Sequence, residues 1–298
     1  MRNQLAALGL ALLCLTGTEA MARCEDYVPQ PKPQNAGRDI VGADLDAIQE
    51  RGFITFAAYE NFPPWSFEQG GKPAGVDIDI ARLIADDLGV EARFKLVTPG
   101  ENLETDLRNW IWKGPVVGGA VVNVMLHVPY DSEFACRVEQ VVFTGTYHIE
   151  GIAIAYRKDQ YPEDPPVPAY FRFDSVAVEN DSISDFYLSA FPGGQLAGNM
   201  QRYPTTADAM KALDGGETKA AMGPRGELEY GLTDNLALHQ PPLPGFAVGE
   251  WTNGLAVHFA YRALGYAVDD AVLAALNDGG IEEIFARYGL VLKKPEYR

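Results

Sequence analysis

The stretch YENFPPWSFEQGGKPAGVDIDIARLIADDLGV, residues 59–90, joins an aromatic loop to a strongly patterned helix. Strand-like sequences flank it: GFITFAAY (52–59) predicts a buried strand, and VEARFKLV (90–97) predicts a half-buried one. A strand, a helix and a second strand in this order predict a parallel pair with a right-handed crossover. The apolar residues that define the helix, which stops at Gly89, are Val76, Ile80, Leu83, Ile84 and Leu88.

The loop before this helix, predicted from Glu60 to Gln69, holds two aromatic rings around a Pro-Pro step. Pro63 and Pro64 have fixed φ angles and cannot join a helix, so the flanking rings lose little entropy on binding. Phe62 is therefore a candidate for stacking on a ligand. Trp65 is a second candidate, although residue-burial tendencies favour inward packing for Trp65 and Phe67.

The helix also carries four acidic residues, which could suggest a cation site. Their spacing follows the solvent face and the first turn, and it matches no EF-hand loop. We interpret them as solvated charges that interact favourably with the helix dipole. The four residues are Asp77, Asp79, Asp86 and Asp87.

A second α/β series follows an apolar, strand-like run over 118–129. Strands are predicted at GIAIAYR (151–157), SVAVEN (175–180) and KAAMG (219–223). The segment 182–191 predicts a helix capped by Asp181 or Ser182, and TTADAMKAL (205–213) predicts one capped by Thr205 or Thr206. The tail returns to a strand at 253–261 and helices around Val268 to Leu276 and at 279–290; whether it rejoins the first unit is left open.

The N-terminus has the features of a secretory leader. Residues 1–22 contain an early Arg, an apolar run too short to span a bilayer, and an A-x-A site, and a buried N-terminal helix is the alternative. The expected mature chain starts near Arg23 with an extended arm to residue 38, and the protein is expected to be periplasmic. In that oxidising compartment Cys24 and Cys136 are predicted to form a disulfide.

The charge balance excludes several classes of function. A net charge of -17 repels phosphate backbones and anionic lipid, so nucleic-acid binding is not expected. After the leader no apolar run is long enough for a membrane helix. The four histidines and the cysteines match no metal or redox motif, so we predict no metal and no cofactor.

Four landmarks in this order resemble the extracytoplasmic solute-binding proteins of the amino-acid-binding type (family 3), the receptors of bacterial ABC importers. They span residues 57–90, 137–156, 175–188 and 254–290. The resemblance implies a bilobal α/β fold, the type II periplasmic-binding-protein fold, with two strands as a hinge. Lobe 1 would comprise residues 39–149 and 249–298, and lobe 2 residues 150–248. It also implies that Phe62 lines the cleft between the lobes.

The sequence departs from the family where an amino acid's carboxylate would bind. His127-Val128-Pro129-Tyr130 stands where the family has Gly-x-Thr, and Arg137 falls on the family's carboxylate-binding Arg. Pro129 offers no N–H. Arg137 can clamp an anion or be an ordinary surface Arg. His127 and Tyr130 stay candidate ligand-binding residues.

The second lobe departs as well. Pro224 stands where the family has the Asp that accepts the ligand's ammonium, and Asp181-Ser182 replaces a Gly-Thr pair. Ser182 can donate to a ligand or only cap its helix, whereas Asp181 favours a cation or a hydroxyl-bearing solute. Glu60, at the end of a strand, can pair with a cationic solute or be a solvated loop charge.

The function expected from these features is capture of a small polar solute by a monomeric protein that hands it to an ABC permease. The alternative is an accessory component of a periplasmic quinoprotein methanol or alcohol dehydrogenase, a subgroup that the His-Val-Pro-Tyr-Asp segment at 127–131 resembles. We do not expect an enzyme, since no catalytic motif is present. A dehydratase-like variant would need a general acid such as Glu60 or Asp131.

Overall fold

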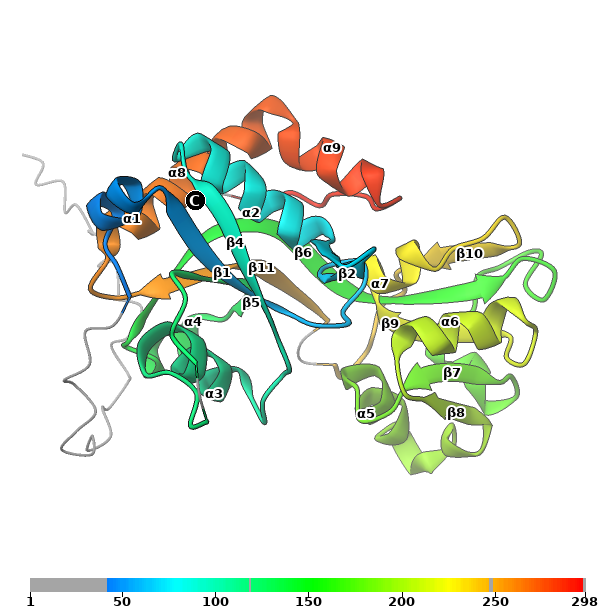
Figure 1. Cartoon of the computed structure of the whole chain (residues 1–298). Helices are drawn as coiled ribbons and strands as arrows, with labels where there is room; N and C mark the ends of the chain where they lie inside the picture. The colour runs from blue at the N-terminus through cyan, green and yellow to red at the C-terminus, as the bar shows by residue number, and fades with distance from the viewer. Residues whose placement is uncertain (1–41, 118, 247–248, 297–298) are drawn as a thin grey trace, which may run out of the picture.

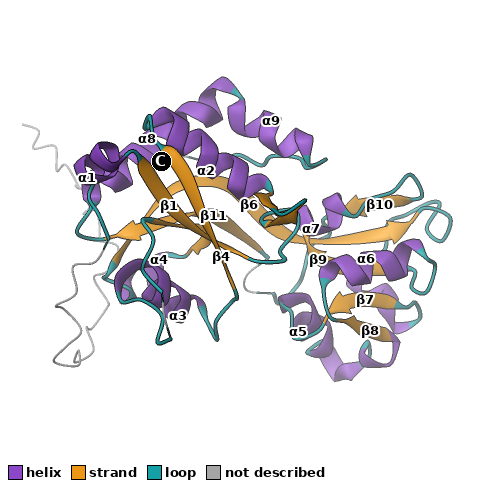
Figure 2. Cartoon of the chain, viewed as in Figure 1, coloured by secondary structure: helices purple, strands orange, loops and turns teal. Residues whose placement is uncertain are grey.

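The computed structural model describes residues 42–117, 119–246 and 249–296. It shows a larger and a smaller α/β lobe side by side (Figures 1 and 2). The strands are β1 (Phe53–Tyr59), β2 (Phe67–Gln69), β3 (Lys72–Ala74), β4 (Glu91–Val97), β5 (Val124–Tyr130), β6 (Val141–Arg157), β7 (Val176–Glu179), β8 (Met200–Tyr203), β9 (Ala220–Pro224), β10 (Leu236–His239) and β11 (Glu250–His258). The helices are α1 (Leu45–Arg51), α2 (Val76–Asp87), α3 (Leu103–Leu107), α4 (Ser132–Arg137), α5 (Ile183–Ser189), α6 (Thr206–Asp214), α7 (Arg225–Tyr230), α8 (Arg262–Asp278) and α9 (Gly280–Arg287).

The first strand, helix and strand form as predicted. β1 and β4 pair in parallel from Phe53 opposite Glu91 to Tyr59 opposite Val97, and α2 connects them. α2 lies with α8 and α9 on one face of the sheet, whereas α3 and α4 lie on the other (Figure 1). The apolar spacing of α2 explains this placement, because Val76, Ile80 and Ile84 are fully buried there.

One strand runs through both lobes. The sheet order is β4-β1-β5-β11-β6-β9-β7-β8, and the 17-residue β6 pairs with β11 in its first part and with β9 in its second. The predicted strand at 151–157 is therefore not a separate element. Gly151 does not take a positive φ, so the chain stays extended through it. β6 and the start of β11 are the strands that connect the lobes.

The buried side chains fall into four clusters. Two of the clusters combine residues from the range 48–147 with residues from the range 255–290. The other two draw on residues between Ile152 and Leu236. The chain after β11 thus returns to the core of the first unit, the point that the sequence left open. The boundaries expected at 149/150 and 248/249 remain a proposal, and this division of the cores is what supports them.

Several short elements were not predicted. The segment Glu60 to Gln69 was expected to be loop, but β2 and β3 form a small hairpin that starts within it. The helices α1, α4 and α7 are six or seven residues long. A helix this short shows too few apolar repeats for a periodic pattern. The helices α5 and α6 each had two candidate caps in the sequence, and the structure shows Ser182 as the cap of α5 and Thr205 as the cap of α6.

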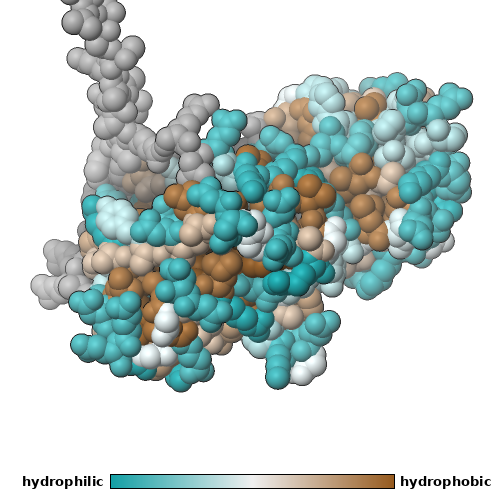
Figure 3. All heavy atoms as spheres, turned by 90° about the horizontal axis from the view of Figure 1, so that it is seen from above, coloured by the Kyte–Doolittle hydropathy of each residue, from teal (hydrophilic) through white to brown (hydrophobic). Residues whose placement is uncertain are grey.

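The described surface is mixed in character. Seen from above, hydrophilic and hydrophobic residues alternate over this face (Figure 3). Among the residues that the structure describes, no helix is both long enough and apolar enough to cross a membrane. The predicted leader and Cys24 lie outside the described residues, so the leader and the Cys24–Cys136 disulfide stay predictions.

The junction between the aromatic loop and α2 is closely packed. Gly75 has a φ of 125°, and a Cβ at this position would lie 2.2 Å from the carbonyl oxygen of Trp65. Gly70 also has a positive φ, of 59°, but a Cβ there meets nothing within 4 Å. Gly70 is therefore a control with a positive φ but without the contact to Trp65.

We expect Gly75→Ala to lower the free energy of unfolding by about 3 kcal/mol or more, because strain and overpacking add. Gly70→Ala, the matched control, should cost about 1–2 kcal/mol for the left-handed conformation alone. Urea denaturation of both variants measures the difference. Equal losses would show that the loop moves away from α2 without cost.

Candidate functional site

A cavity of about 300 Å³ opens between the lobes. Asn61, Phe62 and Pro63 of the aromatic loop line one wall, and Trp251 of β11 lies at the connection between the lobes. The remaining lining residues come from β7, β9, α5, α6, α7 and their ends. They are Glu179, Ser182, Ile183, Ser184, Thr205, Thr206, Ala207, Pro224 and Glu227. Two predicted site residues, Phe62 and Ser182, therefore meet at one cavity.

Phe62 is held by the backbone of its own loop. Its N–H donates to the Ser66 carbonyl, and the Ser66 N–H donates back to the Phe62 carbonyl, both at 2.8 Å. The Ser66 hydroxyl donates to the Tyr59 carbonyl at 2.7 Å. The Phe62 and His127 rings are perpendicular, with a centroid distance of 5.0 Å. The ring is thus fixed at the cavity before any solute arrives.

Trp65 packs in the core beneath the cavity. It is 1% exposed, and its ring lies 4.8 Å from that of His127 and 5.9 Å from that of Phe285. A Cβ on Gly226 of α7 would come within 2.4 Å of this ring. Trp65 therefore touches the second lobe, and the inward alternative describes its position. It is not among the lining residues, and its contact with a ligand stays a prediction.

Two carboxylates from the second lobe face the cavity. Glu179 Oε2 accepts the Thr206 N–H at 2.9 Å and the Thr206 hydroxyl at 2.7 Å. Burial and then the charge of Glu179 raise the pKa of Glu227 to about 8, with a further rise from Glu150 and a partial offset by a hydrogen bond with Thr206. With this raised pKa, Glu227 beside Glu179 keeps its proton at neutral pH.

Neither glutamate was predicted from the sequence as a site residue. An acidic group was sought directly after KAAMG, where Pro224 stands, but Glu227 enters the cavity from α7, three residues later. Glu179, in SVAVEN, ends β7 next to the residues then considered as helix caps. The position of Glu179 at the carboxyl end of a parallel strand is the signal that could have found it.

Two serines of the α5 region complete this wall. Ser182 accepts the Asp185 N–H at 3.1 Å and so acts as the helix cap. Ser184 is fully buried, and its hydroxyl has no partner among the residues that the structure describes. A buried polar group without a partner is unfavourable, so Ser184 Oγ is a group that a ligand can satisfy.

Beneath the aromatic loop lies a buried polar cluster. Asp77 is 1% exposed, and its Oδ1 accepts the Tyr147 hydroxyl at 2.6 Å. Its Oδ2 lies 3.0 Å from His127 Nδ1. The interpretation of Asp77 as a solvated helix charge was wrong, because its side chain points from α2 to β5 and β6. Burial and the Asp77 charge raise the pKa of Tyr147 well above its usual value, so its hydroxyl keeps the proton it donates.

A second buried polar cluster lies where β6 passes between the lobes. Glu150 accepts the Gly151 N–H at 2.8 Å and the Gly226 N–H at 3.2 Å. Arg225 Nε donates to Glu229 at 2.8 Å, and its Nη2 donates to the Val291 carbonyl at 2.8 Å. These contacts connect β6, α7 and the C-terminal segment. Burial raises the pKa of Glu150, with the two backbone donors acting in the opposite direction.

The other predicted site residues do not line this cavity. Glu60 accepts a hydrogen bond from the Thr98 hydroxyl, and His127 Nδ1 lies 3.0 Å from Asp77 Oδ2. The rest lie at three other places. Tyr130 packs its ring on Phe143, Arg137 is exposed over the Phe134 ring, and Asp181 is exposed beside Asn180. Their roles with a ligand stay predictions.

The electrostatic character of the cavity is acidic. Among its lining residues two are glutamates, and none is Lys, Arg or His. Within the described ranges no cluster of three His, Cys, Asp or Glu side chains could hold a metal ion. A cavity with these groups can hold a cation or a hydroxyl-bearing solute between aromatic and acidic surfaces.

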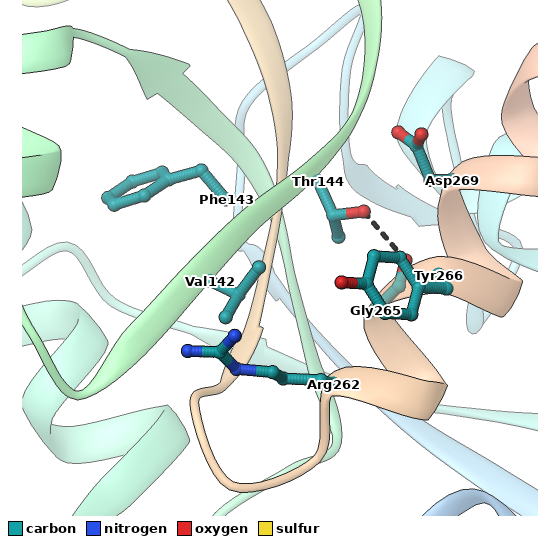
Figure 4. Close-up of a pocket in the computed structure, with 7 residues that line it drawn as sticks. All are labelled: Val142, Phe143, Thr144, Arg262, Gly265, Tyr266 and Asp269. Carbon is teal, nitrogen blue, oxygen red and sulfur yellow. Dashed lines mark hydrogen bonds between the residues drawn. The ribbon is translucent and has the colours of Figure 1, made fainter. Parts of the chain in front are cut away.

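A second hollow, of about 350 Å³, lies on the first lobe between β6 and α8 (Figure 4). The Thr144 hydroxyl donates to the Gly265 carbonyl at 2.7 Å, and the Gly145 N–H donates to Asp269 at 2.9 Å. Arg262 and Tyr266 of α8 complete its lining. All of its walls come from one lobe, so lobe closure cannot enclose a solute there.

Comparison with known proteins identifies the fold. Residues 54–109 match the family model of bacterial extracellular solute-binding proteins, family 3. An ancestral cationic amino acid solute-binding protein is 19% identical, with a TM-score of 0.67 over 82% of this chain and 99% of that one. An amino acid ABC transporter substrate-binding protein from Streptococcus pneumoniae, bound to L-arginine, is 19% identical, with a TM-score of 0.57 over 84% and 99%.

Two further similarities extend the range of relatives. A solute receptor for L-cysteine of Neisseria gonorrhoeae is 19% identical, with a TM-score of 0.55 over 83% of this chain and 93% of that one. A membrane-bound lytic murein transglycosylase F of Actinobacillus succinogenes is 22% identical over 240 residues. That match covers 80% of this chain but 45% of the relative, so the chain spans less than half of that protein's length.

These findings confirm the predicted type II periplasmic-binding-protein fold and the resemblance to the family 3 solute-binding proteins. The resemblance to the subgroup associated with quinoprotein dehydrogenases is not tested by them.

The Asp77 cluster yields a stability prediction. Tyr147→Phe removes the hydroxyl that donates to a buried carboxylate, and we expect the free energy of unfolding to fall by about 1.5–3 kcal/mol. Tyr266→Phe is the matched control, because Tyr266 is 68% exposed. Denaturant titrations of the two variants give the comparison. A Tyr147→Phe variant as stable as the control would mean that Asp77 does not depend on this donor.

Glu227 yields a pH prediction. Between the ordinary pKa of 4.5 and the raised value of about 8, the folded protein holds a proton that the unfolded chain has released. Its contribution to stability is therefore complete below 4.5 and is lost as the pH rises through about 8. Glu227→Gln should gain stability relative to the wild type between pH 5 and pH 8.5, as measured by urea unfolding. A difference that does not change with pH would contradict the raised pKa.

Proposed function

We propose that the protein is a periplasmic receptor that captures a small polar solute between its two lobes and delivers it to an ABC importer in the membrane. One observation carries this proposal: a single cavity is lined by Phe62 of the first lobe and by Ser182, Thr206 and Glu227 of the second. A solute that touches both walls stabilises the closed arrangement of the lobes. The family resemblance and the fold support the same function.

The connection between the lobes suits this mechanism. Two strands, β6 and the start of β11, join the lobes and pair with each other from Glu250 opposite Gly151 to His258 opposite Val141. A small rotation about this pair changes the width of the cavity while the lobes keep their own cores. The cavity volume, about 300 Å³, suits a small molecule.

A second candidate function is the accessory role beside a periplasmic quinoprotein dehydrogenase. The observation in its favour is that Arg137 is exposed over Phe134, away from the cavity, so the described lining offers an amino acid's carboxylate no basic partner. Affinity purification from periplasm separates the two functions. Recovery of a quinoprotein enzyme without a permease supports the accessory role, and recovery of a permease supports the importer receptor.

We propose a binding role in preference to a catalytic one. Neither predicted general acid lines the cavity: Asp131 caps α4 by accepting the Phe134 N–H at 2.7 Å, and Glu60 accepts from Thr98. Glu227, with a pKa of about 8, is the lining group best suited to proton transfer. A catalytic variant would consume its solute, whereas the proposed receptor releases it unchanged.

Phe62 provides the direct test of the receptor function. We expect Phe62→Ala to weaken solute binding about tenfold, because the loss of an aromatic contact costs on the order of 1–1.5 kcal/mol. Phe173→Ala is the control, since Phe173 is 81% exposed and does not line the cavity. Calorimetry with amino acids, amines, small acids and alcohols measures both variants.

The same solutions allow a second readout. Small-angle scattering should show a smaller radius of gyration when a binding solute is added to the wild type, as the lobes close. Absence of binding across the panel, together with no rise in melting temperature, would contradict the receptor function.

A further inference from the structure

We propose that the solute is a small organic ammonium ion that carries no carboxylate group, held by Glu179 and Glu227 against Phe62 and Trp251. This proposal rests on the proposed receptor function and specifies the class of solute. It follows from the charge, the unsatisfied hydroxyl and the aromatic surface of one cavity, each of which is a separate observation.

The charges of the cavity favour a cation. Thr206 donates twice to Glu179 Oε2, and no donor to Oε1 is found in the described part of the chain. Glu227 faces the same space from α7. An ammonium group between the two side chains can donate to both and offset the repulsion between them once both are ionised.

The same wall contains a buried hydroxyl group without a hydrogen-bond partner among the described residues. Ser184 lines the cavity, is fully buried, and has a hydroxyl without a partner among the described residues. A hydroxyl can accept a hydrogen bond from an N–H group or donate one to a ligand oxygen. Beside two carboxylates the ligand group that suits all three is an N–H donor. Ser184 therefore points to a polar ligand independently of the acidic pair.

The aromatic wall fits the same kind of group. Phe62 and Trp251 line the cavity on the side of the first lobe and the connecting strands. Aromatic faces attract organic ammonium ions through their quadrupoles. Pro63, Ile183 and Pro224 add apolar surface for an alkyl chain. The wall offers contacts to both ends of an alkylamine.

A carboxylate on the solute would have no counterpart. No basic side chain is among the described lining residues, and Pro224 contributes no N–H. The cap of α5 is already occupied, because Ser182 accepts from Asp185 and the Asp181 N–H donates to the Asp185 side chain. A solute carboxylate would also approach Glu179 and Glu227. The parent amino acid of an amine should bind more weakly than the amine itself.

Binding should also release a proton. The pKa of Glu227 is about 8 in the empty cavity, raised by burial and by the charges of Glu179 on β7 and Glu150 on β6, with Thr206 of α6 acting in the opposite direction. Arg225 on the same helix pairs with Glu229. A bound cation favours the ionised form, so a proton leaves as the solute enters and the affinity rises from pH 6 to pH 8.

The test uses amines paired with their parent amino acids: agmatine with arginine, putrescine with ornithine, cadaverine with lysine, and ethanolamine with serine. Calorimetry of the full mature chain should show at least one amine that binds at least about tenfold more tightly than its parent. Repeating the titration in buffers of different ionisation enthalpy should show proton release at pH 7. Parent amino acids that bind as tightly as their amines would overturn this inference and leave the receptor function standing.

Matched variants locate the effect. Glu179→Gln and Glu227→Gln should each weaken amine binding about tenfold or more, and Glu227→Gln should also abolish the proton release. Glu283→Gln, an exposed change on α9, should do neither. Thermal unfolding confirms that each variant is folded. Amine binding that is unchanged in both cavity variants would overturn the inference, and failure of every panel solute to bind the wild type would overturn it together with the receptor function.

Discussion

The carboxylate of Asp77 is the group on which the arrangement of the site depends. Its backbone N–H donates to the Trp65 carbonyl at 3.0 Å, so the start of α2 holds the aromatic loop. Its side chain accepts from Tyr147 of β6 and lies beside His127 of β5. One residue thus connects the loop to a strand that runs through both lobes. Phe62 can be rigid because of this connection.

Burying a carboxylate is unfavourable unless its oxygens have polar partners, and this explains why polar side chains surround Asp77. The partner at Oδ1 is the Tyr147 hydroxyl, which retains its proton, and the neighbour at Oδ2 is the His127 ring. Tyr147 thus satisfies one oxygen of the Asp77 carboxylate, whereas Oδ2 lies beside the His127 ring with no hydrogen-bond partner among the described residues. Glu179 and Glu227 differ from Asp77, because they line a cavity in which a solute can provide further hydrogen-bond donors.

The sequence predicted the regular part of the fold from periodicity. α2, β1 and β4 could be predicted because their apolar residues repeat at clear helical or strand spacing, and the parallel pairing followed from their order. Only the second part of β6 was predicted, as a strand that starts at Gly151, although an extended glycine continues a strand that begins at Val141. The return of the tail to the first core could not be decided, since local patterns do not determine which core buries a helix.

The site was harder to predict than the fold. Phe62, predicted because two prolines restrict its loop, and Ser182, predicted as a possible helix cap, both line the cavity. Asp77 was misjudged because it shares a first turn with Asp79, and spacing alone does not say which carboxylate turns inward. Glu227 was missed because a short helix carries it into the cavity from outside the expected position. Side-chain direction in short elements is set by tertiary packing.

Capture of a solute between the lobes can be tested in a crystal structure of the protein purified from periplasm without added solute. We expect electron density for one small molecule that contacts Phe62 of the first lobe and Glu227 of the second. A cavity filled by the protein's own side chains, or a molecule bound to one lobe alone, would contradict it.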